Sequence, residues 1–155
     1  MKMELRRWFL RLPPLLYRVG LAERAGRRFL LLTTRGHRTG RPRTCALNYV
    51  EDGATLYVFS GFGMTHWIHN LLADPAVEVR LGSRRIAATA SLVRDPATRR
   101  RALTLLRERG DAQGPPKPLR PLLARLGFDY DAKLRKVDPE SEEIPVIALA
   151  MRASP

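Results

Sequence analysis

The sequence has few acidic residues for its many basic ones. Against 28 lysines and arginines stand 15 aspartates and glutamates, which gives a formal net charge of +13 and an isoelectric point near 11.2. So strong a positive potential favours an anionic partner, such as nucleic acid, an anionic membrane surface or a polyanionic small ligand. Nearly all of the basic residues are arginine, whose planar guanidinium recognises phosphate and carboxylate by geometry.

Cysteine and long apolar runs are also scarce. The single cysteine, Cys45, excludes a disulfide framework and a cysteine-rich zinc site, and it favours a reducing, cytoplasmic location. No apolar run approaches the roughly 20 residues needed to span a bilayer. Because Arg11 and Pro13-Pro14 interrupt the first apolar run and no small-residue cleavage site follows, we do not expect a signal peptide.

The chain of 155 residues suits one domain, 1–155, which opens with a helical segment over 1–26. Leu5, Trp8, Phe9 and Leu12 recur at helical spacing, with arginines off that stripe. Two interpretations stay open for this segment. It packs on the rest of the domain, or it lies on a membrane surface as a basic amphipathic helix, which would give the protein a peripheral membrane contact.

The remaining sequence predicts an α+β fold that is mainly β. Six stretches are typical of strands: FLLLTT, TCALNYV, ATLYVFS, VEVRL, RRIAATASLV and IPVIALAM. The second is expected as one strand from Thr44 to Val50, with Cys45, Leu47 and Tyr49 on one face. Asp52-Gly53 and Gly82-Ser83 predict hairpin turns.

Helices are expected between these strands. Thr65 is a candidate cap for a helix over 66–73, and Asp95-Pro96 begins a second helix that Gly110 ends. LRPLLARLG adds a helical turn or two, with Leu119, Leu122, Leu123 and Leu126 on one stripe. Hairpins with inserted helices predict a small barrel over 27–93 and 144–151, with a helical insertion over 95–127, and not a doubly wound parallel sheet.

The stretch TTRGHRTGRPRT, residues 33–44, is a candidate anion site. Gly36 and Gly40 permit backbone conformations that turn amide N–H groups inward. Arg38 and Arg43 can add charge-assisted hydrogen bonds, and Thr39 offers a hydroxyl. The stretch is neither a Walker loop nor a G-x-G-x-x-G turn, and a solvated basic loop is the alternative.

A second candidate site is SGFGMTHWIHN, residues 60–70. A strand ends at Ser60, two glycines follow, and a helix N-terminus, which suits anions or polar ring edges, begins soon after. Trp67 and Asn70 share a face of that helix, one as a flat wall and the other as a hydrogen-bonding amide. His66 and His69 have a spacing that can hold a metal, but His37 lies in a distant loop and no acidic ligand is evident, so we expect no metal.

Together the two stretches resemble the deazaflavin-dependent nitroreductase family of flavin and deazaflavin oxidoreductases. LLTTRGHRTGRPRT, a hairpin, and then SGFG, Trp67, Asn70 and Ala73-Asp74-Pro75 follow one another as in that family, clearly over 29–93 and more loosely to the end of the chain. The resemblance implies an FMN-binding-type split β-barrel and coenzyme F420, a deazaflavin with a phosphate and an oligoglutamate tail. It also implies hydride transfer from reduced F420 to a small acceptor: a quinone, an enone or a nitro compound.

The resemblance assigns roles to particular residues. In the first stretch the phosphate and tail would be held by His37, Arg38, Thr39, Gly40 and Arg43. In the second, Ser60 and Gly61 would lie by the deazaflavin ring, Ser60 as a catalytic hydrogen-bond donor, and Trp67 and Asn70 would line the ring pocket. Asn48 and His66 would belong to the substrate pocket.

This chain departs from the family pattern at two of these positions. His37 stands where relatives commonly have the first arginine of Gly-Arg-Arg or Gly-Arg-Lys, which makes one phosphate contact pH-dependent or removes it, and Asn48 stands where some have a tyrosine. FMN is the alternative cofactor, because relatives of this barrel bind other ligands. A non-catalytic cofactor or lipid carrier is the alternative function. Nucleic-acid binding is supported by charge alone and is not expected, and the sequence indicates no oligomeric state.

Overall fold

The computed structural model describes residues 29–60, 64–110, 117–127 and 129–152. The helical segment predicted over 1–26 lies outside these residues. The described elements, in chain order, are β1 (Leu30–Arg35), β2 (Pro42–Leu47), β3 (Tyr49–Asp52), β4 (Thr55–Phe59), α3 (His66–Ala73), β5 (Ala76–Leu81), β6 (Arg84–Leu92), α4 (Pro96–Arg109), η2 (Lys117–Leu119), α5 (Arg120–Arg125), α6 (Tyr130–Arg135) and β7 (Val146–Met151).

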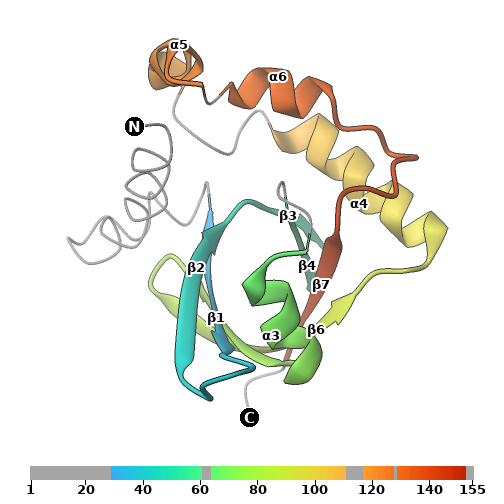
Figure 1. The fold of residues 1–155 in the computed structure, drawn as a ribbon. Helices are drawn as coiled ribbons and strands as arrows, with labels where there is room; N and C mark the ends of the chain where they lie inside the picture. The colour runs from blue at the N-terminus through green and yellow to red at the C-terminus, as the bar shows by residue number, and fades with distance from the viewer. Residues whose placement is uncertain (1–28, 61–63, 111–116, 128, 153–155) are drawn as a thin grey trace.

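Seven antiparallel strands form one sheet in the order β2-β1-β5-β6-β7-β4-β3 (Figure 1). The two edge strands, β2 and β3, are consecutive in the chain and are separated by Asn48 alone. The Cα atoms of Leu47 and Tyr49 can be at most about 7 Å apart, so the two edges of the sheet must meet there. The sheet is therefore curled into a barrel with its seam at Asn48, which confirms the predicted mainly-β split barrel.

The prediction of one strand from Thr44 to Val50 was wrong, because Asn48 divides it into β2 and β3 and raises the strand number from six to seven. β2 pairs with β1, whereas β3 pairs with β4 on the other edge of the sheet. The three side chains that were expected on one face still point to one side of the sheet, although they now belong to two strands with different partners. Cys45, Leu47 and Tyr49 all contact the same core cluster.

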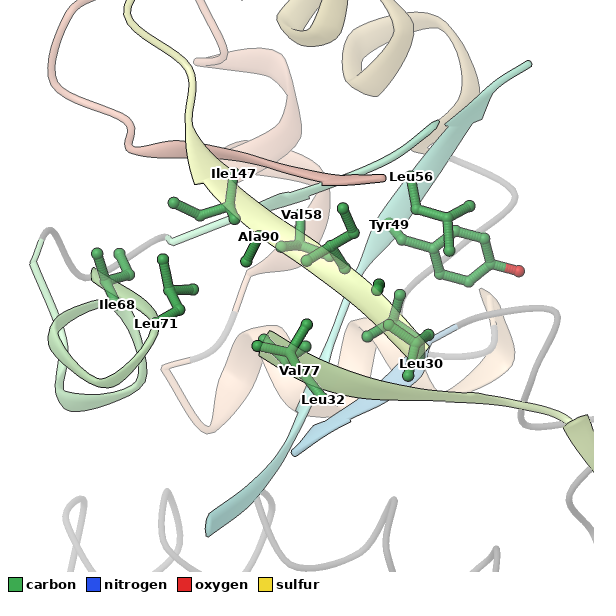
Figure 2. Close-up of a cluster of buried hydrophobic side chains, with 13 residues drawn as sticks. Leu30, Leu32, Tyr49, Leu56, Val58, Ile68, Leu71, Val77, Ala90 and Ile147 are labelled. Carbon is green, nitrogen blue, oxygen red and sulfur yellow. The ribbon is translucent and has the colours of Figure 1, made fainter. Parts of the chain in front are cut away.

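The barrel interior is filled by apolar side chains. Strand alternation sends Leu56 and Val58 inward from β4, and Ile147 and Leu149 inward from β7, and all four are fully buried. Figure 2 shows this cluster, with Ile68 and Leu71 of α3 at one end and Tyr49 at the other. Each such aliphatic side chain contributes about 1.5–3 kcal/mol when it leaves water.

A second core lies on the outer face of the barrel, under α4. The side chains that alternate with the interior set, among them Val50, Tyr57 and Val146, pack there against Leu103 and Leu106 of the helix. α4 begins as predicted, because the Asp95 carboxylate accepts the N–H of Thr98 at 2.9 Å and proline follows at the first helical position. Figure 1 shows α4 lying across this side of the barrel.

The other helices agree only in part with the predictions from the sequence. α3 has the predicted bounds, with Thr65 at its N-cap, but the Thr65 side chain makes no capping bond. Of the four leucines expected on one stripe, Leu123 is buried, whereas Leu119, Leu122 and Leu126 are exposed. α6 was not predicted. Within the described ranges no helix is long and apolar enough to cross a membrane.

Candidate functional site

The connection between β1 and β2, residues 36–41, is a tight loop that is closed by its own backbone. The N–H of Gly36 donates to the Arg41 carbonyl and the N–H of Gly40 donates to the Gly36 carbonyl, both at 2.8 Å. Gly40 has φ of 69°, in the left-handed region that favours glycine. A Cβ on Gly36 would lie 2.8 Å from the Thr39 hydroxyl oxygen and 3.2 Å from the Arg41 carbonyl. Both glycines are therefore required by the loop's shape.

This loop and the strand ends beside it present a dense positive charge. Four arginines there are exposed: Arg35, Arg38, Arg41 and Arg43. Arg35 forms a long, exposed ion pair with Asp74 at 3.8 Å. In the part of the chain that the structure describes, Arg38, Arg41 and Arg43 form no ion pair. We call residues 35–43 the arginine loop. Their charge can be neutralised by an anionic ligand.

The arginine loop is tied to α3 through Asn70. The Asn70 side-chain oxygen accepts the backbone N–H of His37 at 2.9 Å and lies 2.5 Å from His37 Nδ1. The Asn70 Nδ2 donates to the hydroxyl of Thr34 in β1 at 3.1 Å. Asn70 and Thr34 are only 4% and 2% exposed, so these bonds are shielded from water. Asn70 therefore braces the loop against the helix, with one amide N–H making no bond to a described residue.

The three histidines of the chain lie together, which corrects the expectation that His37 is distant from the other two. Its ring centroid is 6.3 Å from that of His66, nearly parallel at 18°, and 5.9 Å from that of His69, tilted by 49°. We call these residues the histidine cluster. Among the described residues, no group of three or more histidine, cysteine or acidic side chains is arranged to hold a metal ion.

The other predicted residues of the 60–70 stretch that the structure describes are less exposed than the three histidines. Trp67 is half-buried and packs against the interior core. Ser60 is 4% exposed and donates its backbone N–H to the Pro145 carbonyl at 3.2 Å. Gly61 lies outside the described residues. The catalytic role predicted for Ser60 thus falls on a buried residue at the end of β4.

The predicted site residues lie in two groups at opposite ends of the β1–β2 hairpin. One group is the arginine loop, and the other contains Asn48 and Ser60. Arg35 and Pro42 pair at the arginine-loop end, and Leu30 and Leu47 pair at the other end, beside Asn48. The six residues of β1 span about 17 Å. Since Tyr49 pairs with Val58, the same barrel corner holds Asn48 and the end of β4, which Ser60 follows. A ligand that contacts both groups must be elongated.

Cys45 takes no part in this chemistry. Burial raises the pKa of its thiol to about 12, so the thiol stays protonated and is neither a nucleophile nor a metal ligand near neutral pH. Its side chain packs against the interior core instead.

Two residues of the site were missed by the sequence analysis. Thr34 reads as an ordinary strand residue, and nothing in the sequence marks it as the partner of Asn70. His69 was considered only as a metal ligand, whereas it belongs to the histidine cluster beside the arginine loop. The signal that could have found it is that all three histidines lie within the two candidate stretches.

Comparison with known proteins identifies what the chain is similar to. The sequence profile of the F420H(2)-dependent quinone reductase family matches residues 18–112. The F420H(2)-dependent quinone reductase of Mycobacterium tuberculosis strain H37Rv is 36% identical over 109 residues, which are 59% of this chain and 72% of that protein.

Solved structures agree on the fold. The structure of an F420-H2 dependent reductase superposes with a TM-score of 0.54 at 24% identity, covering 79% of this chain and 94% of that one. The haem storage protein of Vibrio cholerae superposes with a TM-score of 0.51 at 16% identity, covering 83% of this chain and 84% of that one. At these identities the likeness concerns the barrel alone.

Proposed function

Because the chain belongs to the F420H(2)-dependent quinone reductase family, we propose that it transfers a hydride from reduced F420 to a quinone. The membership confirms the family resemblance drawn from the sequence. The resemblance implied three classes of acceptor, and family membership favours the quinones among them. Enones and nitro compounds are the alternatives. The observation that carries the proposal is the arginine loop, where Arg38, Arg41 and Arg43 form no ion pair with a described residue and suit the phosphate and carboxylates of that cofactor.

The interior of the barrel leaves no room for the cofactor, since fully buried aliphatic side chains fill it (Figure 2). A ligand must therefore lie on the outside, along the β1–β2 hairpin and α3. The separation of about 17 Å between Asn48 and the arginine loop suits a long molecule with a ring at one end and anionic groups at the other.

The arginine loop would hold the anionic end of the cofactor. Arg38 and Arg43 would donate charge-assisted hydrogen bonds to it, and the loop's closed backbone would limit the ordering cost of binding. Gly40 sets the turn, and the Thr39 hydroxyl already accepts the N–H of Arg41 at 3.3 Å, so Thr39 would act chiefly by shaping the loop.

The other predicted residues would form the ring and acceptor end. Trp67 would provide a wall, and Ser60 and Gly61 would lie by the ring, with Ser60 donating a hydrogen bond to a developing negative charge. Asn48 would contact the acceptor there, whereas His66, also expected in the substrate pocket, has its ring centroid 6.3 Å from that of His37 and so lies beside the arginine loop. The bound cofactor supplies the hydride; the protein binds, orients and excludes water.

Asn70 would act on the cofactor indirectly. Its side-chain oxygen already accepts from His37 and its amide donates to Thr34, so it would position the loop and offer at most its remaining N–H. This refines the expectation that Asn70 lines the ring pocket.

Turnover tests the proposal. The purified protein is mixed with reduced F420 and a panel of quinones, enones and nitroaromatics, and oxidation of the cofactor is followed by its absorbance. We expect quinone-dependent oxidation well above the rate without protein. Tight binding of F420 with no acceptor-dependent oxidation would instead establish the carrier alternative, and binding of FMN in place of F420 would contradict the cofactor.

A peripheral membrane contact through residues 1–26 remains part of the proposal, and cytoplasmic location with it. The support is the basic, amphipathic pattern of Leu5, Trp8, Phe9 and Leu12. Flotation with vesicles of anionic lipid, compared with vesicles of neutral lipid, tests it. Equal flotation of the full chain and of a Trp8→Ser/Phe9→Ser variant would contradict this contact.

A further inference from the structure

The histidine cluster is a second feature of the arginine loop that the proposed hydride transfer does not use. The chain has three histidines, and the fold brings His37 from the loop against His66 and His69 from α3, with ring centroids about 6 Å apart. All three side chains are exposed, so protons and ligands from solvent can reach them.

The hydrogen bonds of His37 fix where its protons lie. The Asn70 side-chain atom that receives the His37 backbone N–H must be the oxygen, because an amide nitrogen cannot accept it. The same oxygen lies 2.5 Å from His37 Nδ1, so Nδ1 must carry a hydrogen and donate it. In the neutral ring Nε2 is then the basic atom. A proton can bind Nε2 without breaking the contact that braces the loop.

The brace also fixes the position of the charge that such a proton adds. Asn70 joins His37 to Thr34 of β1 and belongs to α3, so three elements hold the imidazole in place. Imidazole is the side chain whose charge ordinarily changes near neutral pH, so a cluster of three is suited to couple proton binding to anion binding.

The surroundings of the cluster are almost entirely positive. Among the described residues, the charged groups on the elements packed against it are Arg35 of β1, Arg38 and Arg41 of the loop, Arg43 of β2, Arg84 and Arg85 of β6, and Asp74 at the end of α3. The Asp74 carboxylate is paired with Arg35. So positive a setting repels a metal cation and attracts an anion, and each protonated imidazole increases that attraction.

We propose that the histidine cluster is a proton-dependent extension of the arginine-loop anion site, so that a phosphate or carboxylate group and protons bind together. An anion beside the imidazoles stabilises their protonated form, and by linkage acid strengthens anion binding. Affinity for the anion therefore rises as pH falls through the histidine titration range. The inference rests on the proposed function only for the identity of the natural ligand, the anionic end of F420.

The first experiment uses inorganic sulfate, whose charge is constant over this pH range. Imidazole nitrogen signals are followed by NMR from about pH 5 to 8.5, with sulfate or with chloride at equal ionic strength. His→Gln variants assign the three rings. We expect the neutral His37 ring to carry its hydrogen on Nδ1, and sulfate to raise the histidine titration midpoints by roughly 0.3 pH unit or more.

An Arg38→Ala/Arg43→Ala variant should lose this effect of sulfate, and Arg107→Ala, an exposed arginine of α4, should keep it. Midpoints that sulfate leaves unchanged in the wild-type protein would overturn the proposal. So would an equal rise in the Arg38→Ala/Arg43→Ala variant, because the anion would then bind elsewhere.

The second experiment measures F420 affinity at about pH 6 and pH 8 in the wild type and in His66→Gln/His69→Gln. Protonation of the ligand itself contributes equally to both proteins, so the difference between them isolates the cluster. We expect the gain in affinity on acidification to be roughly threefold larger in the wild type. Equal gains in two folded proteins would overturn the proposal and leave the proposed function standing. Absence of F420 binding at both pH values would contradict the proposed function, and the sulfate experiment would still decide this inference.

Discussion

The barrel interior and the arginine loop are built in opposite ways. The interior cluster consists of apolar side chains from six strands and α3, most of them fully buried. The arginine loop has exposed arginine side chains, and few polar contacts hold it among the described residues: those of its own backbone, that of Arg41 with the Thr39 hydroxyl, the Arg35–Asp74 ion pair and those to Asn70. Stability is thus concentrated where no ligand can enter, and binding where little stability depends on the side chains. Substitutions in the two regions should affect different measurements.

The largest effect is expected in the interior. Leu56→Ala removes a fully buried side chain of β4 and should lower the free energy of unfolding by about 2–5 kcal/mol, because a cavity is left in addition to the lost burial. Urea unfolding followed by circular dichroism measures it. Leu122→Ala is the matched control, since that leucine is 56% exposed and its loss should change stability by less than about 0.5 kcal/mol. Equal losses in the two variants would contradict the assignment of the core.

An intermediate effect is expected in the loop. Gly36→Ala places a methyl group 2.8 Å from the Thr39 hydroxyl and 3.2 Å from the Arg41 carbonyl, which forces the loop to move. F420 affinity should fall about tenfold, or about 1.4 kcal/mol, with a smaller change in unfolding free energy. Titration of the cofactor measures it.

Gly40→Ala provides the comparison for this loop variant. A Cβ there meets no atom within 4 Å, but the residue has φ of 69°, so the cost is backbone strain of about 1–2 kcal/mol. We expect Gly40→Ala to retain more affinity than Gly36→Ala. The reverse order would mean that the loop's turn, and not its close contact with Thr39, sets the geometry of the site.

The smallest effect is expected from Cys45. Because burial raises the pKa of its thiol to about 12, a thiol reagent near pH 8 should label the native protein very slowly and leave cofactor binding unchanged. The same reagent should label the urea-unfolded chain at the rate of a free cysteine. Rapid labelling of the native protein would show that β2 separates readily from the barrel. This would contradict the description of the barrel interior as the stable, closed region of the molecule.

Local signals in the sequence were sufficient for some elements of the fold. Asp95-Pro96 begins α4 because a carboxylate cap and a proline at the first helical position act within one turn. The division of the second strand at Asn48 could not be predicted from its alternation. It follows from closure of the barrel, which gives β2 and β3 partners at opposite edges of the sheet.

For the candidate site, too, local features could be predicted from the sequence but contacts between distant segments could not. Both stretches that form it were identified from their own residues, because glycines and arginines in sequence indicate an anion loop wherever the chain places them. The contact between His37 and the two histidines of α3 depends on how the barrel brings the loop to the helix, and its residues are far apart in sequence. The exposure of three of the four leucines between Leu119 and Leu126 could not be predicted for a related reason. Helical spacing predicts a common face, but burial requires a neighbouring element to cover it.

The central claim is that the arginine loop binds the anionic end of F420. The most direct test is equilibrium binding of F420 to the wild-type protein, to Arg38→Ala/Arg43→Ala and to Arg107→Ala, at two salt concentrations. The account predicts binding by the wild type and by Arg107→Ala, a loss of at least about tenfold in the double variant, and a weaker dependence on salt in that variant. Unchanged affinity and salt dependence in a folded Arg38→Ala/Arg43→Ala protein would contradict it.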